Sequence, residues 1–237
     1  MGEVILGYWK IRGLAAAPRL LAAYCGLELK QEFYTSRDVW GPKKEALREE
    51  GMAFPNLPYM IVKDETGKTT LRLTQSVAIL RYIAEKYDML GSTPEERAIA
   101  EMVLEEGRDF ARGFTVLCYG FNPEFNDENV AAFFEKLPSM LTPFEKFLEP
   151  GKWFAGSKLL MCDFFMWHAL EQLVLFRPTC LDDFPKLKDF LVRFESEPKI
   201  KAHMESENFL HWPLNGAIAK WGGGGEDPAP KLVKTSA

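Results

Sequence analysis

The sequence predicts two domains: a small α/β domain followed by an all-helical one. In the first ninety residues, strand-like and helix-like stretches alternate along the chain. After residue 93, apolar residues recur with a helical period almost to the end of the chain. The chain has 237 residues, of which 47% are hydrophobic and 27% are charged, so it has enough apolar material for two modest cores.

The first domain is expected to begin with a strand, a helix and a second strand. Residues 4–9 are apolar and aromatic, as is typical of a short buried strand. After a break at Gly13, residues 14–24 carry apolar side chains at helical spacing, and Gly26 stands where helices commonly end. Residues 30–35 are then predicted to form the second strand.

An irregular stretch is expected next, and it contains Trp40, Gly41, Pro42 and Gly51. In residues 54–59, two prolines stand three positions apart, which neither a helix nor a central strand accommodates, so a shaped loop is predicted. Residues 59–62 and 69–73 are expected to form a hairpin that turns at 64–67, and residues 75–87 a helix. If Pro58 opens the third strand, this order of elements is that of a thioredoxin-like domain.

The domain boundary is expected between residues 87 and 94. Residues 1–87 are assigned to the thioredoxin-like domain and residues 88–93 to a linker. A helix start follows, in which Thr93 is the N-cap, Pro94 takes the first helical position and Glu96 completes a capping box.

The second domain, residues 94–221, is expected to be all-helical. Ile99, Val103, Phe110, Phe114 and Leu117 mark one face of a long first helix. The later helices are predicted at residues 130–148 (bent at Pro138 or Pro143), 163–175, 184–195 and 198–205. Residues 222–237, rich in glycine, proline and charge, are expected to form a flexible tail.

Composition argues against several classes of protein. The formal net charge is −5, and no run of Lys and Arg exceeds two residues, so a nucleic-acid binder is disfavoured. The four cysteines and three histidines show no zinc-like spacing, which favours reduced thiols and no metal site. We expect no signal peptide and no membrane span, because no apolar run approaches 18 residues. The expected location is therefore the cytoplasm.

Several motifs stand in the order and spacing of one protein family. Residues 6–13 (LGYWKIRG), 54–59 (FPNLPY) and 73–82 (LTQSVAILRY) resemble the corresponding segments of the mu-class cytosolic glutathione transferases. Shorter matches follow at residues 117–119, 153–156 and 162–164. The resemblance spans roughly residues 4–221.

The resemblance implies a homodimeric enzyme that adds the thiol of glutathione to hydrophobic electrophilic small molecules, in the manner of detoxification. Glutathione would be a co-substrate bound to the first domain, and no further cofactor is expected. The electrophile would bind between the domains. Two alternatives on the same fold stay open: a non-catalytic carrier of apolar ligands, and a glutathione-dependent isomerase of the prostaglandin type.

Tyr8 is the candidate catalytic residue. A cysteine thiol has a pKa of about 8.5, so only a few per cent is thiolate at neutral pH. Lowering that pKa by ~2 units requires about 2.7 kcal/mol, and one hydrogen bond to a charged acceptor supplies roughly 1.5–3 kcal/mol. Tyr8, at the end of the first strand, would donate such a bond. The alternative is a strand-end tyrosine packed in the core.

Other residues are expected to hold the tripeptide. The backbone of Leu57 would pair with the cysteinyl amide, and the resemblance implies a cis Leu57–Pro58 bond there. Gln75 and Ser76, at a helix start, would bind the γ-glutamyl carboxylate. Simple helix capping is their alternative role, and Ser76 could do both.

The glycyl end is matched by Trp40 and Lys44, which have the family's spacing of four, and Trp9 and Asn56 also match. Three extra residues separate Trp40 from the FPNLPY motif, so Lys43 could replace Lys44, and a solvated lysine-rich surface is a further alternative.

Two residues match positions that act across a dimer. Asp109 matches an acid that reaches the partner subunit's glutathione amine, with a surface ion pair to Arg112 as an equal alternative. Phe54 matches the family's aromatic key, which inserts into the partner's helical domain.

The electrophile pocket is matched by Ile11, Leu14, Thr115 and Tyr119. Tyr119 could donate a hydrogen bond to a developing oxyanion. Ordinary core packing is the alternative for Ile11 and Leu14, and it is favoured more for Leu14. Asn215 and Gly216 stand where the family carries bulkier pocket residues, for which Trp212 could compensate.

Asp163 matches the aspartate of a buried helix cap, whose Ser/Thr partner is replaced here by Leu160. Half of the cap is therefore expected to be missing, at a cost of ~1 kcal/mol. Capping of an earlier turn by Ser157 and a different helix start are both open.

Overall fold

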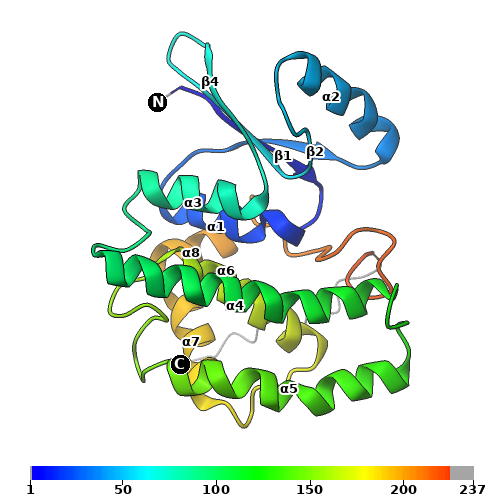
Figure 1. Cartoon of the computed structure of the whole chain (residues 1–237), viewed down its shortest axis with the longest axis vertical. Coiled ribbons are helices and arrows are strands. Elements are labelled where there is room, and N and C mark those ends of the chain that lie inside the picture. Colours follow the sequence, from blue (N-terminus) through cyan, green and yellow to red (C-terminus); the bar gives the residue numbers. More distant parts are fainter. Residues whose placement is uncertain (1, 225–237) are drawn as a thin grey trace.

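The computed structural model describes residues 2–224 and contains one mixed four-stranded sheet (Figure 1). The strand order is β2-β1-β3-β4. β1 runs parallel to β2 and antiparallel to β3, and β3 pairs antiparallel with β4. The strands are β1 (Val4–Trp9), β2 (Lys30–Tyr34), β3 (Tyr59–Lys63) and β4 (Thr69–Thr74).

Three helices accompany the sheet: α1 (Ala16–Tyr24), α2 (Arg37–Glu49) and α3 (Ser76–Lys86). A short 3₁₀ turn, Gly13–Ala15, leads into α1. α1 and α3 pack together between the sheet and the helical domain, whereas α2 stands away from them (Figure 1). The predicted β-α-β and β-β-α units of a thioredoxin-like domain are present, and β3 begins at Tyr59, one residue after Pro58.

The α2 helix corrects the irregular stretch that was expected around Trp40, Gly41 and Pro42. The Ser36 side chain caps this helix by accepting a hydrogen bond from the N–H three residues on, at 3.3 Å. Pro42 lies in the second turn, where it removes a single backbone hydrogen bond. Trp40 and Leu47, two turns apart, are both buried, so one face of α2 is held against the domain.

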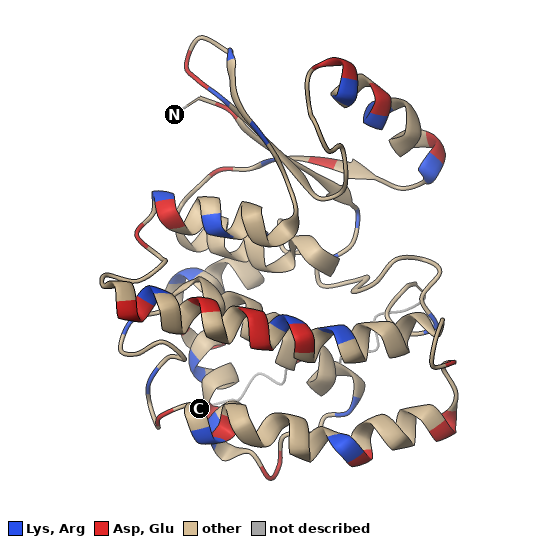
Figure 2. Cartoon of the chain, in the orientation of Figure 1, with Lys and Arg blue, Asp and Glu red and all other residues tan. Residues whose placement is uncertain are grey.

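The second domain consists of helices, as predicted. They are α4 (Pro94–Tyr119), α5 (Asp127–Phe147), α6 (Met161–Phe176), α7 (Pro185–Ser196) and α8 (Pro198–Met204). α5 continues through both of its prolines, and it starts earlier than expected because the Asn126 side chain accepts a hydrogen bond from Asn129 N at 2.9 Å. Both acidic and basic residues occur along α2 and along α4 (Figure 2).

The start of α4 carries the predicted cap with one difference. Thr93 Oγ1 accepts a hydrogen bond from Glu96 N at 3.1 Å, and Pro94 is the first helical residue. The Glu96 carboxylate accepts its bond from Ser92 N at 2.6 Å, one residue before the expected partner. The cap therefore also secures the end of the 88–93 segment.

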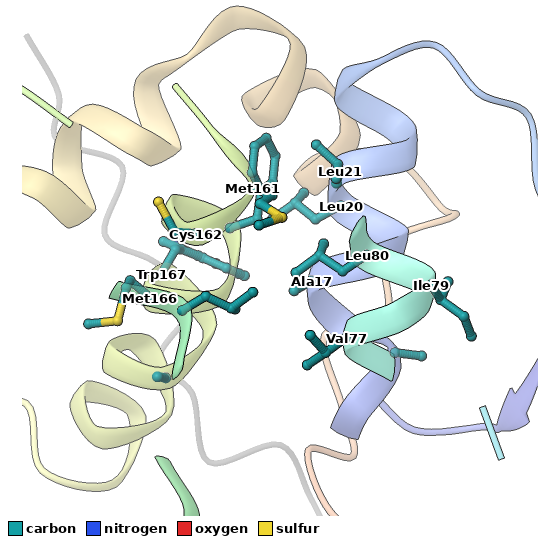
Figure 3. Packing of buried hydrophobic residues seen from close by; sticks show 14 of the residues in the cluster. Ala17, Leu20, Leu21, Val77, Ile79, Leu80, Met161, Cys162, Met166 and Trp167 are labelled. Atoms are coloured by element: carbon teal, nitrogen blue, oxygen red, sulfur yellow. The ribbon is translucent and has the colours of Figure 1, made fainter. Parts of the chain in front are cut away.

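α6 is the central element of the helical domain, buried on nearly every side along its first three turns. In Figure 3, side chains of α1 and α3, among them Leu20 and Leu80, face Met161 and Trp167 of α6 within one buried cluster. The hydrophobic core therefore runs without interruption from the first domain into the second.

α6 begins at Met161, two residues before the expected position, and Asp163 supplies its cap. The Asp163 carboxylate accepts hydrogen bonds from Leu160 N and Phe154 N, both at 2.9 Å. Leu160 has no acceptor to offer in return, and Asp163 N donates instead to the Leu160 backbone carbonyl at 3.0 Å. The half-missing cap is thus confirmed, and a backbone bond takes the place of the lost side chain.

The described part of the expected tail, residues 222–224, begins in contact with the helical domain, since the Gly222 carbonyl accepts a hydrogen bond from Asn215 N at 2.8 Å. The rest of the expected tail lies outside the described residues. No helix within residues 2–224 is both long and apolar enough to cross a membrane.

Candidate functional site

The register of the sheet gathers the predicted glutathione residues at one end of it. Trp9 pairs with Tyr34, Gly7 with Tyr59, and Tyr59 with Thr74. The ends of β1, β2 and β4 and the start of β3 therefore lie side by side. Tyr8, the entry to α2, the Leu57 loop and Gln75 are all attached to this edge.

Tyr8 is the residue before the last of β1, and its side chain is buried, 5% exposed. Its hydroxyl accepts a hydrogen bond from Leu14 N at 3.1 Å. The turn can approach so closely because residue 13 is glycine: its φ is +40°, and a Cβ there would lie 2.7 Å from the Tyr8 hydroxyl. Because the hydroxyl accepts from the backbone, it keeps its own hydrogen for donation.

The electrostatics of Tyr8 make it a donor. The pKa of Tyr8 is raised to about 12: burial is the largest cause and Tyr119 adds to it, while Leu14 N–H and Arg19 act in the opposite direction. The phenol is therefore protonated at neutral pH, as expected for a group that donates to a thiolate. A buried ring also fits the alternative of a core tyrosine, so burial alone does not distinguish the two.

The Leu57 loop has the cis Leu57–Pro58 bond that the resemblance implies. The Leu57 side chain is buried and anchors the loop, while Asn56 is exposed. Leu57 N donates a hydrogen bond to Asn56 Oδ1 at 2.9 Å. The side-chain amide of Asn56 thus occupies the backbone N–H that the cysteinyl group of glutathione would use.

Gln75 and Ser76 stand at the start of α3, as predicted. Gln75 has φ 72° and ψ 115°, a backbone conformation that residues other than glycine rarely adopt. The Gln75 side chain makes no capping hydrogen bond, and the first helical bond runs from Ile79 N to Gln75 O at 3.0 Å. The Gln75 side chain therefore leaves the earlier N–H groups of this turn uncapped, which suits an anion.

On α2, Trp40 is buried, and its ring stacks on Tyr59, with centroids 6.1 Å apart. Lys43 Nζ lies 3.4 Å from Glu32 Oε2, so Lys43 is engaged with the sheet. Lys44, half-buried and one turn after Trp40, has no ion-pair partner within residues 2–224. Of the two lysines, Lys44 is therefore the one left available to a ligand. Trp9 is half-buried at the end of β1.

The residues predicted for the electrophile pocket come from the turn after β1 and from α4. Ile11 is buried, and Thr115 and Tyr119 are half-buried. Leu14 is 58% exposed, so the core role favoured for it is wrong, and Ile11 fits that role better. The reason is the 3₁₀ turn at 13–15, which turns Leu14 outward before the regular period of α1 begins.

The segment 213–216 joins these two elements. Arg12 N donates to Pro213 O at 2.8 Å, and Gly13 N donates to Leu214 O at 2.9 Å. From the other side, Gly216 N donates to the Tyr119 hydroxyl at 2.9 Å. At the position where the family carries a bulkier pocket residue, Asn215 is buried and its side-chain amide donates a hydrogen bond to Trp221 O at 3.1 Å, which helps to fold this segment.

Asp109 is exposed on α4 and forms no ion pair with Arg112 within residues 2–224. It lies on the rim of a groove of about 540 Å³ between α4 and α5. The groove is mainly apolar, and its walls include Met102, Val103, Phe110, Met140, Phe144 and Phe147. Phe54, from the other domain, is 78% exposed. The periodicity of the sequence did not reveal the groove.

Two buried arginines near Tyr8 were missed. Arg12 forms two hydrogen bonds of 2.8 Å to the Glu171 carboxylate, 159 positions away, which links the domains. Arg19 donates to Ile11 O at 2.6 Å and to Gln31 Oε1 at 2.7 Å, and its guanidinium carbon lies 5.7 Å from the centre of the Tyr8 ring. Phe121, stacked on Tyr119 and 75% exposed, was also missed, although an aromatic residue two positions after Tyr119 was a signal. Within residues 2–224, no group of His, Cys, Asp and Glu is arranged to hold a metal ion.

Comparison with known proteins identifies the family. Residues 5–85 match the model of the glutathione S-transferase N-terminal domain, and residues 108–207 match that of the C-terminal domain. The chain is 46% identical to the glutathione S-transferase class-mu 26 kDa isozyme 51 of Fasciola hepatica, with 94% of this chain and 98% of the relative covered. It is 41% identical to glutathione S-transferase Mu 4 of Mus musculus, with 92% and 97% covered.

Among solved structures, the glutathione S-transferase Blo t 8 is similar, with a TM-score of 0.80 and 29% identity over 92% of this chain and 99% of that one. The fold, both domain matches and the relatives agree: this chain belongs to the glutathione S-transferase family, resembles its mu class, and is an enzyme that conjugates the thiolate of glutathione to electrophilic small molecules.

Proposed function

We propose that Tyr8 is the group that holds glutathione in its thiolate form. One observation carries this proposal: Leu14 N–H binds the Tyr8 hydroxyl oxygen and so leaves the hydroxyl hydrogen to donate to sulfur. The raised pKa keeps that hydrogen in place at neutral pH. The bond stabilises the thiolate more than the thiol, so it lowers the pKa of bound glutathione.

The rest of glutathione lies along the same edge of the sheet. Its γ-glutamyl carboxylate binds the N-terminus of α3 at Gln75 and Ser76, and its glycyl carboxylate binds Lys44 beside Trp9 and Trp40. Its cysteinyl amide pairs with the backbone of Leu57, for which the Asn56 side chain releases the N–H that it now binds. Glutathione is the co-substrate, and the reaction needs no further cofactor.

The electrophile binds between the turn after β1 and α4, against Ile11, Leu14, Thr115 and Tyr119. The exposed Leu14 and Phe121 favour apolar electrophiles. Tyr119 accepts its backbone bond from Gly216 and keeps its hydroxyl hydrogen, which can donate to an oxyanion that develops on the electrophile.

The working unit in this proposal is a homodimer in the cytoplasm, with each chain divided into domains at residues 1–87 and 94–221. Phe54 of one copy enters the groove between α4 and α5 of the other. Asp109, on the rim of that groove, is then close to the other subunit and reaches its glutathione amine. The cysteines in the described part of the chain are all free thiols, which suits a reducing compartment.

The test is Tyr8→Phe, assayed with a chloronitrobenzene substrate. We expect turnover to fall by roughly tenfold to a hundredfold, the loss of one hydrogen bond to a charged acceptor, with little change in glutathione affinity. The pH–rate profile should also move toward the free thiol's pKa of about 8.5. Tyr24→Phe, in a half-buried phenol on α1, is the matched control.

Unchanged turnover in Tyr8→Phe would show that the thiolate donor is another group. Ligand binding without conjugation of any electrophile would favour the carrier alternative, and product analysis would reveal an isomerase.

A further inference from the structure

Helix α2 is attached to the sheet by a polar cluster that the catalytic scheme does not use. The cluster, called here the Glu32 clamp, consists of Glu32 and Tyr34 on β2, Lys43 on α2 and Tyr59 at the start of β3. One carboxylate oxygen, Glu32 Oε2, accepts a short hydrogen bond from the Tyr59 hydroxyl and a longer one from the Tyr34 hydroxyl at 3.1 Å, and it lies 3.4 Å from Lys43 Nζ. The two phenol oxygens are themselves 2.7 Å apart.

Aromatic contacts extend the Glu32 clamp to Trp40. The Trp40 ring is nearly parallel to the Tyr59 ring, with 19° between their planes, and it meets the edge of Tyr34 at 5.2 Å between centroids. Lys43 and Trp40 are three positions apart, so they fix neighbouring points of α2. Together with the fully buried Leu47, these two attachments hold one face of α2 against the domain.

The Glu32 clamp carries a single negative charge with donors around it. Burial pushes the pKa of Glu32 upward, but the hydrogen bonds from Tyr59 and the nearby Lys43 outweigh burial and hold that pKa below its usual value. Burial raises the pKa of Tyr34 to about 12, and burial together with Glu32 raises that of Tyr59 higher still. At neutral pH the carboxylate is therefore ionised, and both phenols are donors.

We propose that Glu32 is a positioning residue for the glycyl end of glutathione. By holding Lys43 and Tyr59, it fixes α2 in the orientation that presents Lys44 and Trp40 to the glycyl carboxylate. Glu32 also holds Lys43 by an ion pair, so that Lys44 alone of the two adjacent lysines is left to bind the glycyl carboxylate. This inference rests on the proposed glutathione site and adds to it the group that orients α2.

The consequence is selectivity for a thiol that carries the glycyl residue. γ-Glutamylcysteine has the same thiol and the same γ-glutamyl group as glutathione but lacks glycine. A change that acts only through α2 therefore alters the use of glutathione and leaves the use of γ-glutamylcysteine as it was. A general loss of structure would affect both thiols.

The experiment compares Glu32→Gln with the parent enzyme on both thiols, with one electrophile at saturation. Gln keeps the shape of Glu32 but loses the charge that holds Lys43. We expect the KM for glutathione to rise roughly threefold to tenfold with kcat nearly constant, and the KM for γ-glutamylcysteine to stay the same. Lys43→Gln, which changes a partly exposed side chain, should give the same pattern even if Glu32→Gln folds poorly.

Glu45→Gln is the matched control, because Glu45 is an exposed carboxylate on the same helix that pairs with Arg48. An unchanged KM for glutathione in Glu32→Gln and Lys43→Gln, or an equal rise for both thiols, would overturn the proposal. Lys44→Met separates this inference from the proposed site. If Lys44→Met prefers glutathione over γ-glutamylcysteine as strongly as the parent does, the proposed glycyl site itself is wrong. If Lys44→Met loses that preference while Glu32→Gln and Lys43→Gln keep it, only the positioning role of Glu32 is wrong.

Discussion

At the scale of single residues, Gln75 shows backbone strain at the proposed glutathione site. Its φ of 72° with ψ of 115° costs roughly 1–3 kcal/mol for a residue with a Cβ. Its exposed side chain makes no capping bond that would repay this cost within the free protein. The conformation instead directs the first N–H groups of α3 toward the proposed γ-glutamyl carboxylate, which is a functional use of the strain.

Gln75→Gly is predicted to raise stability and lower glutathione affinity together. Glycine tolerates the positive φ, so after its own entropic cost we expect a gain of roughly 1 kcal/mol in the free energy of unfolding. The loss of the side chain should raise the KM for glutathione. Urea denaturation and steady-state kinetics measure the two effects. Gln75→Ala keeps the strain and loses the same contacts, so a Gln75→Ala protein as stable as Gln75→Gly would contradict the account.

The sequence predicted those site residues that lie within short, contiguous motifs. Tyr8, Leu57 and Gln75 stand in short contiguous motifs at strand ends, and the sheet brings them to one edge. Arg12 and Arg19 were missed because a charged side chain is normally expected at the surface. Their burial depends on partners that no local pattern shows, such as Glu171 in α6 for Arg12.

At the scale of elements, α2 shows where local patterns mislead. Gly41 and Pro42 are both unfavourable inside a helix, so the sequence predicted an irregular stretch despite its apolar residues at helical spacing. The signals for a helix were present: Ser36 in the N-cap position, and Trp40 and Leu47 two turns apart. The decisive contact, Trp40 against Tyr59, is a tertiary one, and it joins residues that lie far apart in the chain.

The start of α6 depends on Asp163, and Asp163→Ala is predicted to be strongly destabilising. Leu160 N and Phe154 N would both lose their acceptor in a buried place. Each buried N–H without a partner costs about 1–3 kcal/mol, so we expect a loss of about 2–4 kcal/mol after partial relaxation. Urea denaturation measures the change.

The matched control for this variant is Asp189→Ala, because Asp189 is an exposed aspartate on α7 that pairs with Arg193. We expect it to change stability by less than about 1 kcal/mol. Equal losses in the two variants would mean that the Asp163 carboxylate does not support the start of α6.

At the scale of the whole molecule, buried polar groups join the two domains. Arg12, from the turn after β1, pairs with Glu171 and lies over the ring of Trp167 at 5.2 Å. His168, beside them in α6, is also buried, and its Nε2 lies 3.0 Å from the Gln172 side-chain nitrogen. The packing of the two domains against each other therefore depends on the ionisation states of Glu171 and His168 in α6.

His168 predicts a loss of stability in acid. Burial, together with the nearby Arg12, lowers the pKa of His168 from 6.5 to about 3. Below pH 6.5 the unfolded chain binds a proton that the folded protein refuses, so stability falls as the pH drops from 6.5 toward 3. At pH 5 the loss from this group is about 2 kcal/mol. Urea midpoints measured between pH 7 and 5 should fall accordingly.

The His168→Gln variant should show that fall reduced by about the same 2 kcal/mol, because its side chain does not titrate. His211→Gln, at an exposed position, should retain the pH dependence of the parent. Parallel curves for His168→Gln and the parent would show that His168 is protonated in the folded protein.

Assembly is the last level, and in the proposed dimer it depends on Phe54 and the α4–α5 groove. Phe54, 78% exposed, and the apolar groove with its partly exposed Met102 and Phe147 are each unfavourable in water. In the proposed dimer, one isologous interface would bury the Phe54 side chain and the groove of both subunits. Two insertions of about 1.5–3 kcal/mol each predict that Phe54→Ala weakens the dimer by roughly 10²- to 10⁴-fold. Analytical ultracentrifugation over a range of concentrations measures this change.

Met140→Glu tests the other half of the contact, because it places a charge in the groove without touching Phe54. Val192→Ala, at an exposed apolar side chain on α7, should leave the dimer intact. Since Asp109 on the groove rim serves the other subunit in this arrangement, the dissociated variants should also bind glutathione more weakly. A Phe54→Ala protein that dissociates at the concentration of the parent would place the subunit contact elsewhere and leave Asp109 without its proposed role.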